Sequence, residues 1–159
     1  MPTVLMVCTG NLCRSPMAEA LLLARLARDE ARQGWQIASA GIWTVDGRPA
    51  SAFAIEEMAR RGLDLSGHIS RNITRTLMIE ADLVLAMTRK HIEALGAAFP
   101  AHARKVYLLS EMSGQIRDVG DPYGGPRQQY AYIAKILEQL IADGYKRIVK
   151  LAKEMSAGH

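Results

Sequence analysis

Residues 4–16 read Val-Leu-Met-Val-Cys-Thr-Gly-Asn-Leu-Cys-Arg-Ser-Pro. The apolar run that ends at Cys8 is typical of a strand buried on both faces of a parallel sheet. A helical pattern begins at Arg14, after five intervening residues. Pro16 fits the first turn of that helix, because its missing N–H group is not needed there. The stretch therefore predicts a strand, a short loop and a helix N-terminus.

The predicted loop combines a nucleophile with a cation. Backbone N–H groups at a helix N-terminus bind anions, and the guanidinium of Arg14 can hold two phosphate oxygens at once. A helix N-terminus and a neighbouring cation also favour a thiolate over a thiol, so that Cys8 needs no dedicated base to attack phosphorus. We expect a phosphate-binding loop with Cys8 as nucleophile and Arg14 as phosphate clamp.

The other residues of the loop are expected to shape it or to bind phosphate. Ser15 lies where its hydroxyl can donate to the Cys8 thiolate. Gly10 is expected to permit a turn that a Cβ would oppose, and Asn11 to hold the loop through side-chain-to-backbone hydrogen bonds. The predicted phosphate- and substrate-binding residues of the loop are Thr9, Gly10, Asn11, Leu12, Cys13 and Ser15. The alternative to a phosphate-binding loop is that Cys8 is a buried structural cysteine and that Arg14 caps or pairs elsewhere.

The composition is that of one compact domain spanning residues 1–159, with 49% hydrophobic residues. No run of 18 apolar residues predicts a membrane span, and the chain enters a strand at once, without the pattern of a secretory leader. Two cysteines in one loop fit a reducing cytoplasm, and no Cys/His cluster has zinc spacing. We expect a cytoplasmic monomer without metal or cofactor.

The net charge of +4 is spread over short basic pairs, such as Arg60-Arg61, Arg89-Lys90 and Arg104-Lys105. These pairs form no basic stripe with interleaved aromatic residues, so nucleic-acid binding is not supported. A mildly positive field would instead favour encounters with phosphorylated, acidic partners.

Strands and helices alternate along the chain. The predicted strands cover residues 3–7, 35–39, 81–87 and 105–109, and the predicted helices cover residues 14–32, 50–61, 88–98 and 126–153. This order predicts an α/β fold, a single domain with a four-stranded parallel sheet flanked by helices on both faces. Ligands of such sheets bind beyond the carboxyl ends of the strands, at the topological switch point. Cys8 ends the first strand and lies at such a place.

Five motifs resemble those of the low-molecular-weight protein tyrosine phosphatases. They are Val-Cys-Thr-Gly-Asn-Leu-Cys-Arg-Ser-Pro-Met-Ala-Glu at 7–19, Ser39-Ala40-Gly41, His68-Ile69-Ser70-Arg71, Asp82-Leu83-Val84-Leu85-Ala86-Met87 and Asp121-Pro122-Tyr123-Gly124-Gly125. Their order and spacing are those of the family, so the resemblance covers nearly the whole chain, and it is strongest to the bacterial branch. It implies a cofactor-free phosphatase with a phosphocysteine intermediate. Its partners would be phosphorylated proteins, with a cognate tyrosine kinase as a candidate.

Asp121 is the predicted general acid. Phosphoryl transfer to Cys8 needs a proton for the departing oxygen, which a carboxyl group at the cleft usually supplies. Pro and Gly hold the segment around Asp121 in defined turns, and the matching residue of the family acts first as acid and then as base. One alternative is that Asp121 only forms a turn. The other is that Asp118 is the acid.

Four further positions follow from the resemblance. Ser39 and His68 match residues that support the phosphate loop together with Asn11, although His68 by spacing alone could be an ordinary surface histidine. Trp43 and Tyr123 match two loops that flank the pocket, where aromatic walls suit a planar phosphoaryl group. Plain packing within its loop is the alternative for Trp43.

Leu12 bears on the choice between phosphotyrosine and phosphoarginine. An apolar residue that faces the pocket favours an aromatic ring. It would leave the N–H groups of a guanidinium without acceptors, and each unpaired N–H group costs about 1–3 kcal/mol of binding free energy. In the arginine-phosphatase branch of the family, the residue that matches Leu12 looks like a Thr, which can accept a hydrogen bond. The motifs at 83–88 and 121–125 nevertheless resemble that branch. We expect a tyrosine phosphatase, with arginine phosphatase as the alternative.

The sequence disfavours an arsenate reductase and a phosphate-binding adaptor. An arsenate reductase needs resolving thiols outside the first loop, whereas the chain has only Cys8 and Cys13. A phosphate-binding adaptor would be expected to lack Cys8, Arg14 or Asp121.

The spacing of the two cysteines suggests a disulfide that protects Cys8 from over-oxidation, or else a space-filling role for Cys13.

Overall fold

A parallel sheet of four strands forms the centre of the computed structural model, which describes residues 1–158. The strands are β1 (Thr3–Cys8), β2 (Gln36–Gly41), β3 (Leu83–Ala86) and β4 (Val106–Leu108). Their order in the sheet is β2-β1-β3-β4, and every neighbouring pair is parallel. Because β2 and β3 flank β1, the topological switch point lies at the carboxyl end of β1, where Cys8 stands. The predicted fold class is confirmed.

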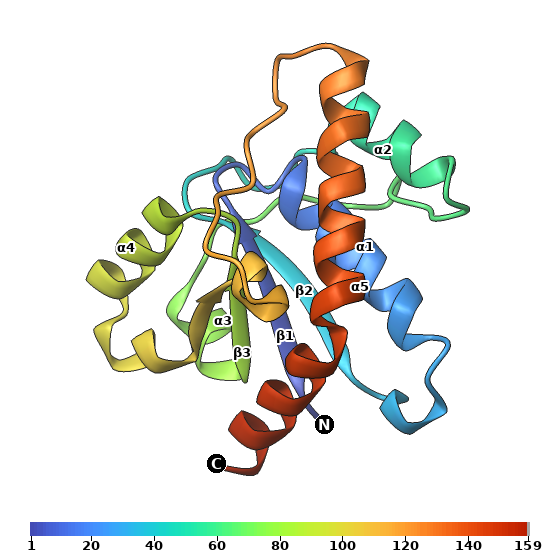
Figure 1. Cartoon of the computed structure of the whole chain (residues 1–159). Helices are drawn as coiled ribbons and strands as arrows, with labels where there is room; N and C mark the ends of the chain where they lie inside the picture. Colours follow the sequence, from blue (N-terminus) through green and yellow to red (C-terminus); the bar gives the residue numbers. More distant parts are fainter. Residues whose placement is uncertain (159) are drawn as a thin grey trace.

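Helices cover both faces of this sheet (Figure 1). The helices are α1 (Arg14–Leu26), α2 (Ala52–Ala59), α3 (Arg75–Glu80), α4 (Arg89–Ala98) and α5 (Arg127–Ala157). Residues of α1, α2 and α5 share one hydrophobic cluster with the sheet, and residues of α3 and α4 share the other. Figure 1 shows the same division, with α3 and α4 on the left of the sheet and α1, α2 and α5 on the right.

The central strand β1 is buried on both faces. Val4 and Met6 point into the cluster of α1 and α5, whereas Leu5 and Val7 point into the cluster of α3 and α4. This alternation follows from the two-residue period of a strand. It explains why the apolar run of β1 is continuous, as parallel sheets require.

The first helix is shorter than the predicted range of residues 14–32. It ends at Leu26, and a separate 3-10 turn, η1 (Glu30–Arg32), follows. The carboxylate of Asp29 accepts a hydrogen bond from the backbone N–H of Ala31 and another from the hydroxyl of Tyr145. The bond to Ala31 caps the 3-10 turn and competes with continuation of α1, and the bond from Tyr145 in α5 holds Asp29 in that position.

Three short elements were absent from the sequence prediction. They are α3, η2 (Pro100–Lys105) and η3 (Leu109–Ser113). Helix α3 is six residues long and buries only Met78, so it has no periodic pattern to detect. Its N-terminus is capped by Thr74, whose hydroxyl accepts from the backbone N–H of Leu77.

None of the helices within residues 1–158 combines the length and the apolar character that a membrane crossing requires. The same residues contain no group of three or more His, Cys, Asp or Glu side chains arranged to hold a metal ion.

Candidate active site

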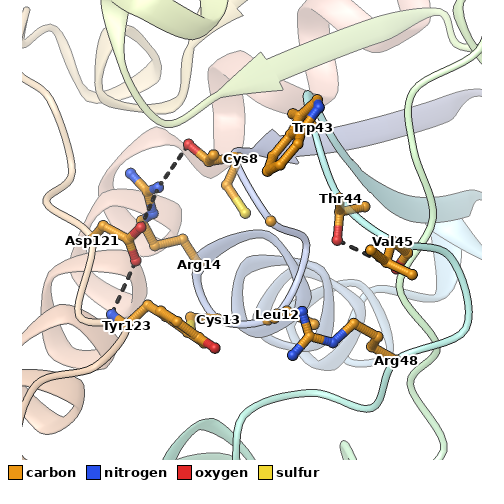
Figure 2. Close-up of a pocket in the computed structure, with 12 residues that line it drawn as sticks. Cys8, Leu12, Cys13, Arg14, Trp43, Thr44, Val45, Arg48, Asp121 and Tyr123 are labelled. Atoms are coloured by element: carbon orange, nitrogen blue, oxygen red, sulfur yellow. Dashed lines mark hydrogen bonds and ion pairs between the residues drawn. The ribbon is translucent and has the colours of Figure 1, made fainter.

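The loop that joins β1 to α1 forms the floor of a cavity of about 220 Å³ (Figure 2). The residues that line it are Cys8, Thr9, Gly10, Leu12, Cys13, Arg14, Trp43, Thr44, Val45, Arg48, Asp121 and Tyr123. Nine of the predicted site residues are among them. The remaining four, Asn11, Ser15, Ser39 and His68, do not line the cavity, and their hydrogen bonds lie behind the loop.

Cys8 and Ser15 form a buried pair at the base of the cavity. The Sγ atom of Cys8 lies 3.0 Å from Oγ of Ser15. Ser15 also accepts a hydrogen bond of 2.9 Å from Nδ2 of Asn11. Because Oγ of Ser15 accepts from Asn11, its own hydrogen is available to Sγ of Cys8. A hydrogen bond from Ser15 can stabilise a thiolate at Cys8.

Asn11 holds the loop from behind. Its Nδ2 group donates to Ser39 as well as to Ser15, at 2.9 Å each, and its Oδ1 accepts from the backbone N–H of Arg71 at 3.0 Å. The carbonyl oxygen of Asn11 lies 2.7 Å from Nε2 of His68, which therefore donates to it. Burial lowers the pKa of His68, so this contact involves the neutral ring at neutral pH.

The strained position of the loop is Asn11 and not Gly10, which corrects the expectation from the sequence. Asn11 has a φ of 56°, whereas Gly10 is not among the residues with positive φ. A Cβ at Gly10 would meet only the side chain of Leu12, at 3.8 Å. Asparagine enters the left-handed region more easily than most residues because its short amide can form local hydrogen bonds.

Gly41 lets the loop pack directly on the end of β2. A Cβ at this position would lie 2.7 Å from the carbonyl oxygen of Thr9 and 3.1 Å from the carbonyl carbon of Gly10. Backbone atoms cannot move aside cheaply, so any larger residue would displace the loop. Gly41 was not predicted as a site residue, although it ends the Ser39-Ala40-Gly41 motif.

Arg14 is buried with one donor left unpaired. Nη1 donates to the carbonyl of Val119 at 2.9 Å, and Nη2 contacts Thr9 Oγ1 and Asp121 Oδ2 at 3.4 Å each. Nε is buried and has no hydrogen-bond partner within residues 1–158. Buried polar atoms are almost always paired. An unpaired guanidinium donor beside Cys8 therefore marks a position for an oxyanion.

Asp121 and Asp118 have different surroundings. Asp121 lines the cavity, is 48% exposed and lies against Arg14. Asp118 accepts from the backbone N–H of Arg89 at 2.9 Å and from its Nε at 3.2 Å. The backbone hydrogen bond is the largest cause of the lowered pKa of Asp118. Asp118 thus ties its loop to the start of α4 and is poorly suited to donate a proton.

The mouth of the cavity is formed by two segments. Trp43, which is 81% exposed, belongs to the connection between β2 and α2, and the exposed Tyr123 belongs to the loop before α5. Sequence reasoning missed three other residues of the first segment, namely Thr44, Val45 and Arg48. Their only sequence signal is proximity to Trp43.

Cys13 is hydrogen-bonded on the side of α2 and α5. Its Sγ lies 2.9 Å from Ser51 Oγ and 3.5 Å from the hydroxyl of Tyr130. Both cysteines are free thiols. Burial raises the pKa of the Cys13 thiol, and it also raises the pKa of Tyr130 to about 12. At neutral pH Cys13 therefore holds its proton, and a protonated thiol is a poor nucleophile.

A comparison with known families identifies the chain. The sequence profile of the family described as low molecular weight phosphotyrosine protein phosphatase matches residues 3–156. The chain belongs to this family. The family resemblance expected from the five motifs is thus confirmed. As a member of this family, the protein is a phosphoric monoester hydrolase.

Similar proteins of this phosphatase family include tyrosine and arginine phosphatases by name. A probable low molecular weight protein-tyrosine-phosphatase, EpsP, of Ralstonia nicotianae is 38% identical over 87% of this chain and 88% of its own length. A protein-arginine-phosphatase of Bacillus subtilis is 36% identical over 92% of this chain and 97% of its own length. The names of its relatives therefore do not decide the substrate of this phosphatase.

Solved structures of both kinds share the fold of this phosphatase. The low molecular weight protein tyrosine phosphatase from T. tengcongensis has a TM-score of 0.86 and 37% identity, covering 92% of this chain and 99% of that one. The YwlE arginine phosphatase from Geobacillus stearothermophilus has a TM-score of 0.85 and 34% identity, covering 94% of this chain and 95% of that one.

Proposed function

We propose that this phosphatase hydrolyses phosphotyrosine in proteins through a phosphocysteine at Cys8. The observation that carries the proposal is the unpaired, buried Nε of Arg14 beside the Cys8–Ser15 pair, in a cavity with apolar and aromatic walls. A phosphate group bound in the loop would take this donor and the N–H groups at the start of α1. The planar ring would lie between Trp43 and Tyr123.

In the first step, Sγ of Cys8 attacks phosphorus and the bond from phosphorus to the phenolic oxygen breaks. Asp121 gives its proton to that oxygen, so that tyrosine leaves as a neutral phenol. Arg14 holds two of the equatorial oxygens, where charge accumulates. The location of Asp121 at the cavity, 3.4 Å from Arg14, supports this role.

In the second step, water hydrolyses the phosphocysteine. The Asp121 carboxylate takes a proton from the water, whose oxygen attacks phosphorus as the bond from sulfur to phosphorus breaks. Ser15 then stabilises the departing thiolate through its hydroxyl. Inorganic phosphate leaves, and both the thiolate and the protonated acid are restored for the next cycle.

Leu12 supports tyrosine over arginine as the phosphorylated residue. It lines the cavity and is 8% exposed, and it offers no hydrogen-bond acceptor to a substrate. Asp121 is the one carboxylate in the described lining, and it already contacts Arg14. A phosphoarginine guanidinium would therefore bring several N–H groups into a wall with few acceptors.

Arginine phosphatase remains the second candidate. The 36% identity to the Bacillus subtilis protein-arginine-phosphatase extends over 92% of the chain. The reaction would use the same Cys8, Arg14 and Asp121. Only the contacts of the leaving group would differ, and Leu12 is the residue that tests them.

We place the enzyme in the cytoplasm as a monomer that acts on phosphorylated proteins, among them a cognate tyrosine kinase. Two free thiols at the site support a reducing compartment. The exposed Trp43 and Tyr123 give a protein substrate open access to the cavity. Arg48, also exposed at the cavity, adds positive charge toward an acidic peptide.

Cys13 supports a redox role for the loop. We propose that peroxide converts the Cys8 thiolate to a sulfenic acid, and that Sγ of Cys13 then displaces water to form a disulfide. Cys13 must first leave its hydrogen bonds to Ser51 and Tyr130. The disulfide would protect Cys8 from irreversible oxidation, and a thiol reductant would restore the enzyme.

Cys8→Ser tests the nucleophile. The variant should lose turnover of an aryl phosphate, because a serine hydroxyl is a poor nucleophile without a base. It should still bind inorganic phosphate, because Arg14 and the loop amides remain. Steady-state kinetics and titration calorimetry measure the two properties, and turnover near that of the wild type would refute a Cys8 mechanism.

Asp121→Asn tests the acid through the leaving group. Hydrolysis of phosphotyrosine, whose phenol departs poorly without a proton, should slow about 10²–10⁴-fold. An aryl phosphate with a highly acidic phenol should be affected much less. Asp118→Asn is the matched control and should show no such dependence on the leaving group. An equal loss on both substrates in Asp121→Asn would contradict the assignment.

Cys13→Ser tests the protective disulfide. After mild peroxide treatment, mass spectrometry of the wild type should detect a peptide pair linked through Cys8 and Cys13, and dithiothreitol should restore activity. The variant should be inactivated without recovery, because its sulfenic acid has no thiol partner in the loop. Full recovery of Cys13→Ser would show that Cys13 has no protective role.

Leu12→Thr tests the substrate. The unmodified enzyme should cleave phosphotyrosine peptides with a higher kcat/KM than phosphoarginine peptides. The variant should shift that ratio toward phosphoarginine by about 10-fold, since it gains a hydrogen-bond acceptor and loses apolar contact. Leu12→Val, which gains no acceptor, is the control. A preference of the unmodified enzyme for phosphoarginine would overturn the argument from Leu12.

A further inference from the structure

His91 joins the N-terminal turn of α4 to the loop that carries Cys8. It is 5% exposed and is the third residue of the helix, where both of its ring nitrogens have hydrogen-bond partners. Nδ1 accepts from the backbone N–H of Thr88 at 3.1 Å, which leaves the ring proton on Nε2. Nε2 lies 2.8 Å from Oγ1 of Thr9 and therefore donates to it.

Thr9 extends this constraint to Arg14. Its Oγ1 also accepts from Nη2 of Arg14 at 3.4 Å, so that one oxygen binds both the imidazole and the guanidinium. The other contact of Nη2 is the carboxylate of Asp121. Under the proposed mechanism Asp121 must turn to the leaving oxygen, and Thr9 then remains as the fixed partner of Nη2.

We propose that His91 is a positioning residue of the active site, which fixes the Thr9 hydroxyl and thereby orients the guanidinium of Arg14 toward phosphate. His91 itself lines no part of the cavity. The inference rests on the proposed phosphatase function only for its effect on turnover, because phosphate binding can be measured without turnover.

The charges around His91 are compatible with this role. Arg14 faces it from α1, and Asp118 and Asp121 face it from the loop before α5. Burial, followed by the charge of Arg14, lowers the pKa of His91 to about 4 despite these two carboxylates. At neutral pH the ring can therefore accept at Nδ1 and donate at Nε2, whereas an imidazolium could not accept from Thr88 and would repel Arg14.

A purely structural role for His91 would be limited to the helix cap. Thr88 and His91 form a capping box, in which Oγ1 of Thr88 accepts from the backbone N–H of His91 at 3.3 Å. Thr88→Ala removes this bond but keeps the backbone N–H that binds Nδ1. It weakens the cap without removing the contact between His91 and Thr9, and is the matched control.

The test compares the full chain with Thr88→Ala, His91→Ala, Thr9→Val and the double variant of positions 9 and 91. Titration calorimetry gives the Kd of inorganic phosphate, and an aryl phosphate gives kcat. We expect His91→Ala to weaken phosphate binding and lower kcat by about 3- to 10-fold, since one hydrogen bond that orients the clamp is lost. Thr88→Ala should keep both values while its Tm falls.

The double variant distinguishes action through Thr9 from independent effects. It should bind phosphate no more weakly than Thr9→Val alone, because His91 acts only through that residue. Multiplied losses in the double variant would overturn the proposal, and so would His91→Ala with the Kd and kcat of the wild type. If the wild type does not hydrolyse the aryl phosphate, the proposed function fails, while the phosphate Kd values still decide the role of His91.

If His91→Ala does not fold, His91→Gln replaces it in the comparison. Glutamine can accept from Thr88 and donate to Thr9, so its phosphate Kd should stay within about twofold of the wild type. A loss as large as that of Thr9→Val would overturn the proposal.

Discussion

The loop at the end of β1 depends on the side chain of Asn11, which binds three separate segments of the chain. It donates to Ser15 at the start of α1 and to Ser39 in β2, and it accepts from the backbone of Arg71. Because Asn11 also has the positive φ, one residue both makes the turn and supplies the bonds that stabilise it. Because this amide donates to Oγ of Ser15, the hydroxyl hydrogen of Ser15 stays available for the 3.0 Å contact with Sγ of Cys8.

The guanidinium of Arg14 joins the two halves of the site. It begins at the N-terminus of α1, yet two of its nitrogens contact Val119 and Asp121, more than a hundred residues further along the chain. The segment of Val119 is in turn bound to the end of β3, where the backbone N–H of Val119 donates to Met87. The loop that carries Cys8 and the segment that carries Asp121 are thus joined through the buried guanidinium of Arg14.

The strand, loop and helix of residues 4–16 were predictable because their signals are local. A continuous apolar run, a cysteine and an arginine at loop spacing, and a proline in the first turn all lie within 13 residues. The parallel sheet followed from the alternation of strands and helices. The placement of Asp121, Trp43 and Tyr123 at the cavity needed the family resemblance as well, because no local pattern connects these residues with Cys8.

The features that the sequence did not predict depend on contacts between distant residues. The early end of α1 involves Asp29 and Tyr145, which are 116 residues apart. His91 and Thr9 are 82 residues apart, and a histidine in a capping box departs from the usual Glu or Gln. The close approach of Gly41 to the loop is visible only once β1 and β2 are paired.

Cys8 and Asp121 belong to segments that differ in burial, and we expect these segments to differ in local stability. Val4 to Val7 are at most 1% exposed in the centre of the sheet, so the amides of this strand should exchange with solvent only through global unfolding. The segment of residues 117–125 is mostly exposed and has few backbone hydrogen bonds, which is typical of segments that open locally. The proposed nucleophile therefore ends a strand buried at the centre of the sheet, while the proposed acid belongs to an exposed segment that can open locally without disturbing the core.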